Sequence, residues 1–309
     1  MQIPENIRQG EDGRLLLVGG RHNVLRLFTG ETRPAAGTVE TFLSNHRQRR
    51  EICAGRGISF SQWVFPDPIT FPGSLGAGQG QSVLRAALRD ASWPDDLHYP
   101  WDLIAPYPER QLKTDTHYSP LGAACLARAA ASAAFGHDDP DHFAQIVAQA
   151  SLKSGYRGDL AVQCDPPPEE SRLVLPGVPA LQSASSGLQA GNNGIIHLIR
   201  SEQAVSERRL LIFGDSFFRS MLGELARYWR TIIFLRTPFF HSEMLNAVAP
   251  DDIFGGMAER YFPSVQPDAE RPHFLAWPLM QGRGTNPDPG FAELWSDLID
   301  SRALATVTQ

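Results

Sequence analysis

The stretch RLLIFGDSFFRSMLGELARYWRTIIFLR, residues 209–236, decides the fold. It opens with an apolar run, Arg209 to Phe213, that is typical of a buried strand, and the tight turn Gly214-Asp215-Ser216 follows. Apolar side chains then recur at the spacing of a helix with one apolar face. These are Phe217, Phe218, Met221, Leu222, Leu225 and Trp229. A second apolar run, Thr231 to Leu235, predicts another buried strand.

A strand, a helix and a strand at this spacing imply parallel strands joined by a right-handed crossover. Segments on both sides extend the pattern, with helices expected over 38–54, 81–91, 120–135 and 141–150, and strands over 58–65, 97–104 and 252–258. The predicted fold class is α/β, with a central, mainly parallel sheet flanked by helices. Residues 1–309 are expected to form a single domain, with an irregular excursion rich in Pro, Gly and Ser at about 151–190.

The composition is that of a globular protein with a sizeable core. Of the 309 residues, 42% are hydrophobic and 20% are charged, which excludes a disordered, charge-rich chain. The net charge of −6 leaves no basic excess to neutralise phosphates, so we do not expect nucleic acid as a partner. The three cysteines form no Cys-x-x-Cys pair, which supports neither a zinc site nor a disulfide framework. We expect no metal and no cofactor.

The N-terminal sequence MQIPENIRQGEDGRLLLVGG shows no export signal. It lacks a basic segment followed by an apolar run of about 7–15 residues. No stretch approaches the roughly 20 apolar residues that a membrane-spanning helix needs. For the sequence as it stands, these features predict a cytoplasmic location.

Ser216 is a candidate nucleophile. In parallel sheets, ligands bind at the carboxyl ends of the strands, where the turn carrying Ser216 is expected to lie. The N-terminus of the following helix offers free N–H groups and a partial positive charge, which can stabilise an oxyanion. The alternative is structural, with Asp215 and Ser216 serving only to cap the helix.

A serine nucleophile needs a base, and the base needs an orienting group. The segment KTDTHYSP, residues 113–120, offers both. Asp115 and His117 precede the Ser119-Pro120 helix start, so we expect an extended or turn conformation, and in an extended chain the two side chains project to the same side. The carboxylate could then bind one imidazole nitrogen while the other faces Ser216. The alternative is a polar loop with an incidental histidine.

Together these segments resemble the SGNH/GDSL esterases and acyltransferases. GDSF at Gly214–Phe217, after the strand LLIF, looks like their nucleophile block. DTHYSPLGA at Asp115–Ala123 looks like the Asp-x-His-Trp motif of the alginate O-acetyltransferase family, in which the Asp-His pair precedes the serine. Further matches are GRLLLVGGRHNVLRLFTG near the start, PDPITFP at 66–72, GDL at 158–160 and PDDIFGGMAERYF at 250–262. The resemblance covers about residues 13–262.

The resemblance implies an SGNH-like three-layer fold and a covalent mechanism. Ser216 would attack an acyl donor, His117 would take its proton, and Asp115 would stabilise the imidazolium. Backbone N–H groups near Ser216 and Phe217 would bind the oxyanion. The implied function is an O-acetyltransferase that transfers an acetyl group to a carbohydrate, either a polysaccharide or its precursor. An acetyl-esterase of the same fold, and a non-catalytic carbohydrate-binding or scaffold protein with a relic site, are the alternatives.

The sequence also departs from the family. Tyr118 stands where the family usually has tryptophan, which keeps an aromatic wall and adds a hydroxyl. We name Tyr118, Arg236 and Arg260 as candidates for substrate contacts, with ion pairing inside the fold as the alternative for the arginines. The family works in the periplasm, whereas no export signal is visible here. It also implies partners among other polysaccharide-assembly proteins.

Overall fold

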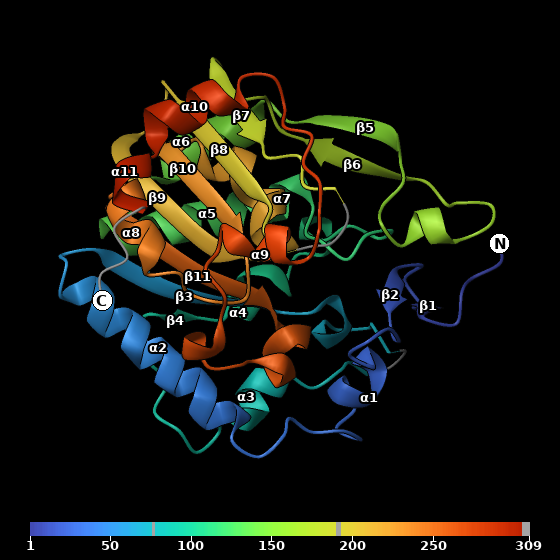
Figure 1. Ribbon diagram of the computed structural model, residues 1–309. Helices are drawn as coiled ribbons and strands as arrows, with labels where there is room; N and C mark the ends of the chain where they lie inside the picture. The colour runs from blue at the N-terminus through green and yellow to red at the C-terminus, as the bar shows by residue number, and fades with distance from the viewer. Residues whose placement is uncertain (76–77, 190–192, 305–309) are drawn as a thin grey trace.

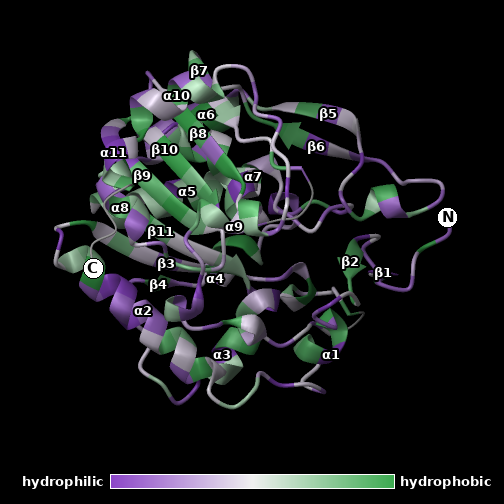
Figure 2. Ribbon diagram, viewed as in Figure 1, coloured by the Kyte–Doolittle hydropathy of each residue, from purple (hydrophilic) through white to green (hydrophobic). Residues whose placement is uncertain are grey.

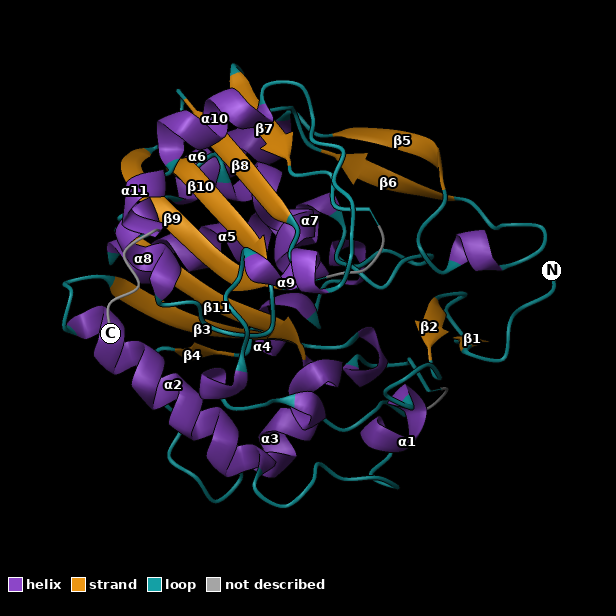
Figure 3. Cartoon of the chain, in the orientation of Figure 1, coloured by secondary structure: helices purple, strands orange, loops and turns teal. Residues whose placement is uncertain are grey.

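A seven-stranded sheet forms the centre of the computed structural model, which describes residues 1–75, 78–189 and 193–304. The strands are β3 (Ser59–Phe65), β4 (Leu97–His98), β7 (Leu181–Ser185), β8 (Ile196–Ser201), β9 (Ser206–Gly214), β10 (Trp229–Arg236) and β11 (Asp252–Ala258). Their spatial order is β4-β3-β11-β9-β10-β8-β7. The first five of these are parallel, and β8 and β7 are added antiparallel at one side. Figure 3 shows this sheet between layers of helices.

Alternate residues of the central strands face two different helix layers. Leu210 and Ile212 of β9 pack with α5 (Pro120–Phe135) and α7 (Ser216–Leu225) in one cluster of buried side chains. Leu211 and Phe213 pack on the opposite face against α8 (Glu243–Val248) and α10 (Phe291–Leu298). Both faces are buried, which is why the strand reads as a continuous apolar run. The strands are accordingly among the most hydrophobic segments in Figure 2.

The N-terminal part of the chain packs beside this sheet. Helix α2 (Thr38–Ala54) runs along β3, and a third cluster of buried side chains joins it to neighbouring short elements. The remaining helices and strands are β1 (Ile7–Gln9), β2 (Leu15–Leu17), α1 (Val24–Phe28), α3 (Val83–Ala87), α4 (Trp101–Ile104), α6 (Pro140–Ala148), β5 (Ser151–Tyr156), β6 (Glu170–Val174), α9 (Ala276–Met280) and α11 (Ser301–Leu304). Among the residues that the structure describes, no helix is both long and apolar enough to cross a membrane.

Most of the predicted elements are confirmed. The strand, helix and strand over residues 209–236 are β9, α7 and β10, and the two strands are parallel. The helix ends at Leu225, however, and Trp229, which was expected on its apolar face, begins β10. The helix expected from Ser119-Pro120 is α5, whose first turn is capped by the Ser119 hydroxyl accepting from the N–H of Gly122. The predicted α/β class with a mainly parallel sheet flanked by helices is therefore correct.

Two expectations about local structure are wrong. The strand expected over 97–104 ends at His98, because Pro100 breaks it and begins helix α4. The expected irregular excursion at about 151–190 instead contains β5, β6 and β7. Its Pro, Gly and Ser residues indicated loop, and the pairing of β5 with β6 and of β7 with β8 overrides that local preference.

Candidate active site

Asp215 fixes the turn that carries Ser216. Its Oδ1 accepts from the N–H of Phe217 at 2.9 Å, which caps α7, and its Oδ2 accepts from the N–H of Ala258 at 2.6 Å. The second bond ties the turn to the end of β11. Close packing beneath the turn leaves no room for a side chain at Gly256, where a β-carbon would lie 2.1 Å from the Phe218 ring. Ser216 is thus presented at the carboxyl ends of the central strands, as predicted.

Ser216 itself is half-buried, and its hydroxyl forms no hydrogen bond with any described residue. One turn further along α7, Ser220 instead donates its hydroxyl to the carbonyl of Phe217 at 2.7 Å. The two serines therefore differ in kind. Ser216 has an unengaged hydroxyl at the helix N-terminus, whereas Ser220 is bonded to its own helix.

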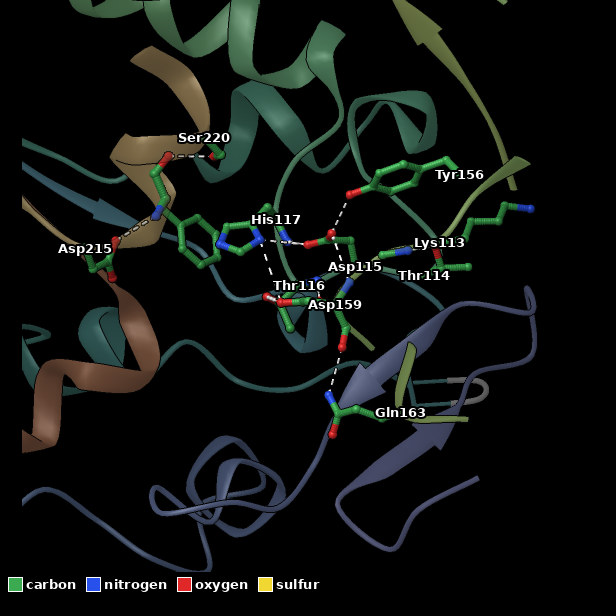
Figure 4. A network of polar contacts seen from close by, with 12 residues as sticks. Lys113, Thr114, Asp115, Thr116, His117, Tyr156, Asp159, Gln163, Asp215 and Ser220 are labelled. Atoms are coloured by element: carbon green, nitrogen blue, oxygen red, sulfur yellow. Dashed lines mark hydrogen bonds and ion pairs between the residues drawn. The ribbon is translucent and has the colours of Figure 1, made fainter. Parts of the chain in front are cut away.

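Asp115 and His117 contact each other directly, as Figure 4 shows. Oδ1 of Asp115 lies 2.7 Å from Nδ1 of His117 and also accepts from the backbone N–H of that residue at 2.9 Å. The second bond closes a local turn between residues i and i+2. The spacing of the two residues in the sequence therefore places the carboxylate beside the imidazole.

Asp115 is ionised, and this determines the state of the imidazole. Burial tends to raise the pKa of Asp115, but hydrogen bonds from His117 and Tyr156 outweigh it and leave that pKa well below its usual value. An ionised carboxylate can only accept hydrogen bonds, so Nδ1 of His117 carries the proton. In this tautomer Nε2 bears the lone pair that a general base needs. Within the described part of the chain, this Nε2 atom is buried and has no hydrogen-bond partner.

Phe217 links the imidazole to the helix that begins with Ser216. Its ring centroid lies 5.1 Å from that of His117, with the two planes inclined by 48°. The same ring packs against Phe65 and Tyr118 in the core. The residue next to Ser216 therefore forms a wall against which the imidazole rests.

Two residues that the sequence reasoning did not single out support Asp115. The hydroxyl of Tyr156, at the end of β5, donates to Oδ2 of Asp115 at 2.6 Å. The backbone N–H of Asp159 donates to the same oxygen at 3.2 Å. Asp159 lies in the GDL segment that matched the family, so a signal for it was present. Nothing local marks Tyr156.

Asp115, His117 and Asp159 lie close enough together to resemble a metal site. Their carboxylate oxygens are already engaged, however. Both oxygens of Asp159 accept from Thr116, at 2.8 Å from its N–H and 2.6 Å from its hydroxyl. Both oxygens of Asp115 accept bonds as described above. A cation would have to displace these donors, so the geometry favours a hydrogen-bonded network over a metal centre.

The predicted substrate contacts differ in their surroundings. Tyr118 is buried, and its hydroxyl donates to the carbonyl of Pro66 at 2.8 Å, which gives it a role in the core. Arg260 is buried and forms an ion pair with Asp67 at 2.8 Å, the structural alternative for this residue. Arg236 ends β10 beside Gly214, and its guanidinium forms no hydrogen bond or ion pair with a described residue. Nη2 of Arg260 is also buried without a hydrogen-bond partner among the described residues, so both arginines keep unused donors near the turn.

The two predicted oxyanion donors also differ. The N–H of Phe217 is engaged by Oδ1 of Asp215. The N–H of Ser216 is the first of helix α7 and points, like all such groups, out of the helix N-terminus. Oxyanion binding at Ser216 and Phe217 stays a prediction, with Ser216 the better placed donor in this arrangement.

A second hydroxyl, imidazole and carboxylate array lies at the end of β10. The hydroxyl of Thr237 lies 2.9 Å from Nε2 of His241, and Nδ1 of His241 lies 3.0 Å from Glu243. Thr237 and His241 are buried, and the Thr237 hydroxyl also accepts from the N–H of Phe239. A hydroxyl so enclosed cannot reach a substrate, so this array supports the fold rather than chemistry.

Comparison with known proteins identifies likenesses in structure only. The sequence matches no protein-family model and no curated protein. Bacillus cereus PatB1 with a sulfonyl adduct superposes with a TM-score of 0.57 at 11% identity, covering 83% of this chain and 97% of that one. A DHHW family protein from Eubacterium siraeum superposes with a TM-score of 0.54 at 13% identity, covering 77% of this chain and 89% of that one. The O-acetyltransferase domain of Pseudomonas putida AlgJ superposes with a TM-score of 0.51 at 18% identity, covering 90% of this chain and 99% of that one. These likenesses confirm the predicted SGNH-like α/β fold.

Proposed function

We propose that this protein is a serine O-acetyltransferase that transfers an acetyl group to a carbohydrate through an acyl-enzyme at Ser216. The observation that carries the proposal is the state of His117. Its Nδ1 is fixed by an ionised Asp115, its ring rests on the residue next to Ser216, and its Nε2 is buried without a partner among the described residues. A buried, unpartnered imidazole nitrogen costs stability and therefore needs an explanation, and accepting a proton from a serine hydroxyl supplies one.

The proposed reaction has two half-reactions that use the same groups. Oγ of Ser216 attacks the carbonyl of the acetyl donor while Nε2 of His117 takes the hydroxyl proton. Nε2 then returns the proton to the leaving group as the donor's ester bond breaks, which leaves acetyl-Ser216. A sugar hydroxyl next gives its proton to Nε2, and its oxygen attacks the acyl carbonyl. The proton returns to Oγ of Ser216 as the acetylated sugar leaves. Asp115 stabilises the imidazolium in both halves.

The acetyl group and the carbohydrate acceptor are inferred from likeness. One similar structure is an O-acetyltransferase domain, and its likeness spans most of both chains. The sequence motifs DTHY and GDSF resemble the same class of enzyme. The guanidinium of Arg236 lies beside the turn and is bonded by no residue that the structure describes, so Arg236 is the side chain we propose to contact the substrate.

Two alternatives use the same residues differently. A carbohydrate acetyl-esterase would pass the acyl group from Ser216 to water, because Nε2 of His117 can take a proton from water as readily as from a sugar. A carbohydrate-binding or scaffold protein with a relic site would form no acyl-enzyme. The reactivity of Ser216 separates the relic site from the transferase and the esterase.

The test is intact-mass spectrometry after incubation with p-nitrophenyl acetate, with and without a panel of oligosaccharides. We expect wild type to gain one acetyl group on Ser216. A sugar that accelerates its loss and becomes acetylated identifies a transferase. Loss at the same rate with every sugar supports the esterase, and a folded protein with no adduct contradicts the proposal.

The matched variants are Ser216→Ala and Ser220→Ala, which remove hydroxyls one turn apart on the same helix. Only Ser216→Ala should abolish the adduct. A fluorophosphonate or sulfonyl fluoride probe gives a second reading, because either reagent reacts with an activated serine and not with a relic. Labelling that survives Ser216→Ala would show that another residue is the nucleophile.

A further inference from the structure

The hairpin of β5 and β6 projects from the body of the protein at the upper right of Figure 1. Most side chains of β5 are exposed, so the hairpin contributes little to the core. At one end of the hairpin, Tyr156 and Glu170 face each other across the two strands. Both side chains reach the segment that carries Asp115.

Glu170 binds the backbone immediately before Asp115. Its carboxylate accepts from the N–H of Lys113 at 2.9 Å, and from the N–H and the hydroxyl of Thr114 at 2.8 and 2.6 Å. Charge-assisted bonds of this kind are stronger than neutral ones. They fix the path of the chain into Asp115.

Tyr156 binds the carboxylate itself. Its hydroxyl occupies Oδ2 of Asp115, so that Oδ1 remains turned toward Nδ1 of His117. The guanidinium of Arg172, on β6, lies 3.8 Å from the centroid of the Tyr156 ring and so restrains it. The aromatic ring is therefore anchored on one face while its hydroxyl contacts the active site.

We propose that this pair of facing residues, Tyr156 and Glu170, positions Asp115 and His117 for proton transfer. The proposal rests on the proposed function, because it names the element that orients the base of that reaction. Glu170 sets the backbone and Tyr156 sets the rotation of the carboxylate. Neither residue touches the reacting atoms, so both are positioning residues rather than catalytic ones.

The first test compares Tyr156→Phe with Tyr99→Phe. Tyr99 is a matched control because its hydroxyl also donates to a carboxylate, Glu259, at 2.7 Å. The donors to Glu259 are Ser82, Leu84 and Tyr99, none of which belongs to the segment that carries Asp115 and His117. We expect Tyr156→Phe to lower kcat for p-nitrophenyl acetate roughly tenfold with little change in KM, because one hydrogen bond to a charged group is lost. Without that donor, Oδ2 attracts the imidazolium more strongly. The acidic limb of kcat/KM should move to higher pH in this variant alone.

The second test uses Glu170→Ala and Glu170→Gln. The alanine variant should lower kcat as Tyr156→Phe does, since the backbone before Asp115 is released. Glutamine keeps one oxygen that can accept from Thr114, so it should restore part of the lost activity. Equal activity in both Glu170 variants would contradict a positioning role for this residue.

A readout without turnover separates this proposal from the proposed function. The proton on Nδ1 of His117 should give a downfield NMR signal that shifts or broadens in Tyr156→Phe and is unchanged in Tyr99→Phe. An active wild type whose pH profile and Nδ1 proton signal are the same in Tyr156→Phe would overturn the positioning role and leave the function standing. An inactive wild type whose signal responds to Tyr156→Phe would overturn the proposed function and leave the positioning role standing.

Discussion

The ring of Phe217 lies against the imidazole of His117, with 5.1 Å between the ring centroids. This contact joins two segments that are far apart in the sequence, the GDSF turn and the DTHY loop. Because Phe217 directly follows Ser216, the contact places the turn that carries the candidate nucleophile beside the candidate base.

Replacing Asp115 with Asn should nearly abolish acylation of Ser216. The amide can donate to Nδ1, which would put the imidazole proton on Nε2 and remove the lone pair that acts as base. In serine enzymes such a change lowers kcat by about 10⁴. Stopped-flow acylation with p-nitrophenyl acetate measures the loss, and circular dichroism checks the fold. A fall of less than tenfold would mean that Asp115 does not set the tautomer.

Phe217 should matter for both stability and activity. Phe217→Ala leaves a cavity among Phe65, Tyr118 and His117, which should cost about 3–5 kcal/mol of unfolding free energy. Phe217→Leu fills most of that space and should cost less. Urea unfolding gives both values. Activity in the leucine variant should still fall, since the aromatic wall against the imidazole is lost. Full activity there would show that the wall is not needed.

Stability should decrease as the pH rises through neutrality because of Glu259. Burial raises the pKa of Glu259 to about 7, although Ser82, Leu84 and Tyr99 donate hydrogen bonds that partly oppose this effect. An acid with a raised folded pKa favours the folded state below its unfolded pKa, near 4.5, and loses that contribution as the pH rises through about 7. A pKa shift of this size corresponds to about 3 kcal/mol of unfolding free energy.

The measurement for Glu259 is urea unfolding at several pH values from 5 to 8. Glu259→Gln cannot ionise, so its stability should change less over this range than that of wild type. By contrast, the pKa of Asp115 is lowered, so its contribution is present above its unfolded pKa and does not change between pH 5 and 8. Parallel curves for wild type and Glu259→Gln would show that Glu259 stays charged throughout.

Removal of metal should leave acylation unchanged. The oxygens of Asp115 and Asp159 already accept hydrogen bonds from Tyr156, Thr116 and His117. Dialysis against EDTA followed by the acylation assay tests this directly. Activity that is lost with EDTA and restored by Zn²⁺ would instead identify Asp115, His117 and Asp159 as metal ligands.

Much of the fold could be predicted because it follows from local patterns. The buried run before Gly214, the helical spacing after Ser216 and the Ser119-Pro120 helix start are confirmed as β9, α7 and α5. The extension of the sheet by β8 and β7 was not predicted. The short strand β7 gains its stability from pairing with β8, and its own sequence carries little preference for a strand.

The sequence by itself determined the pieces whose geometry is local. Asp115 and His117 are two residues apart and meet through a short turn, and Asp215 caps the helix that follows it. Only the tertiary structure decided what surrounds them. Tyr156 and Glu170 reach Asp115 and its neighbours across more than 40 residues of chain, and Asp67, just after β3, pairs with Arg260, just after β11. Such contacts depend on how strands and loops pack in space, because these residues lie too far apart in the sequence for a local turn to bring them together.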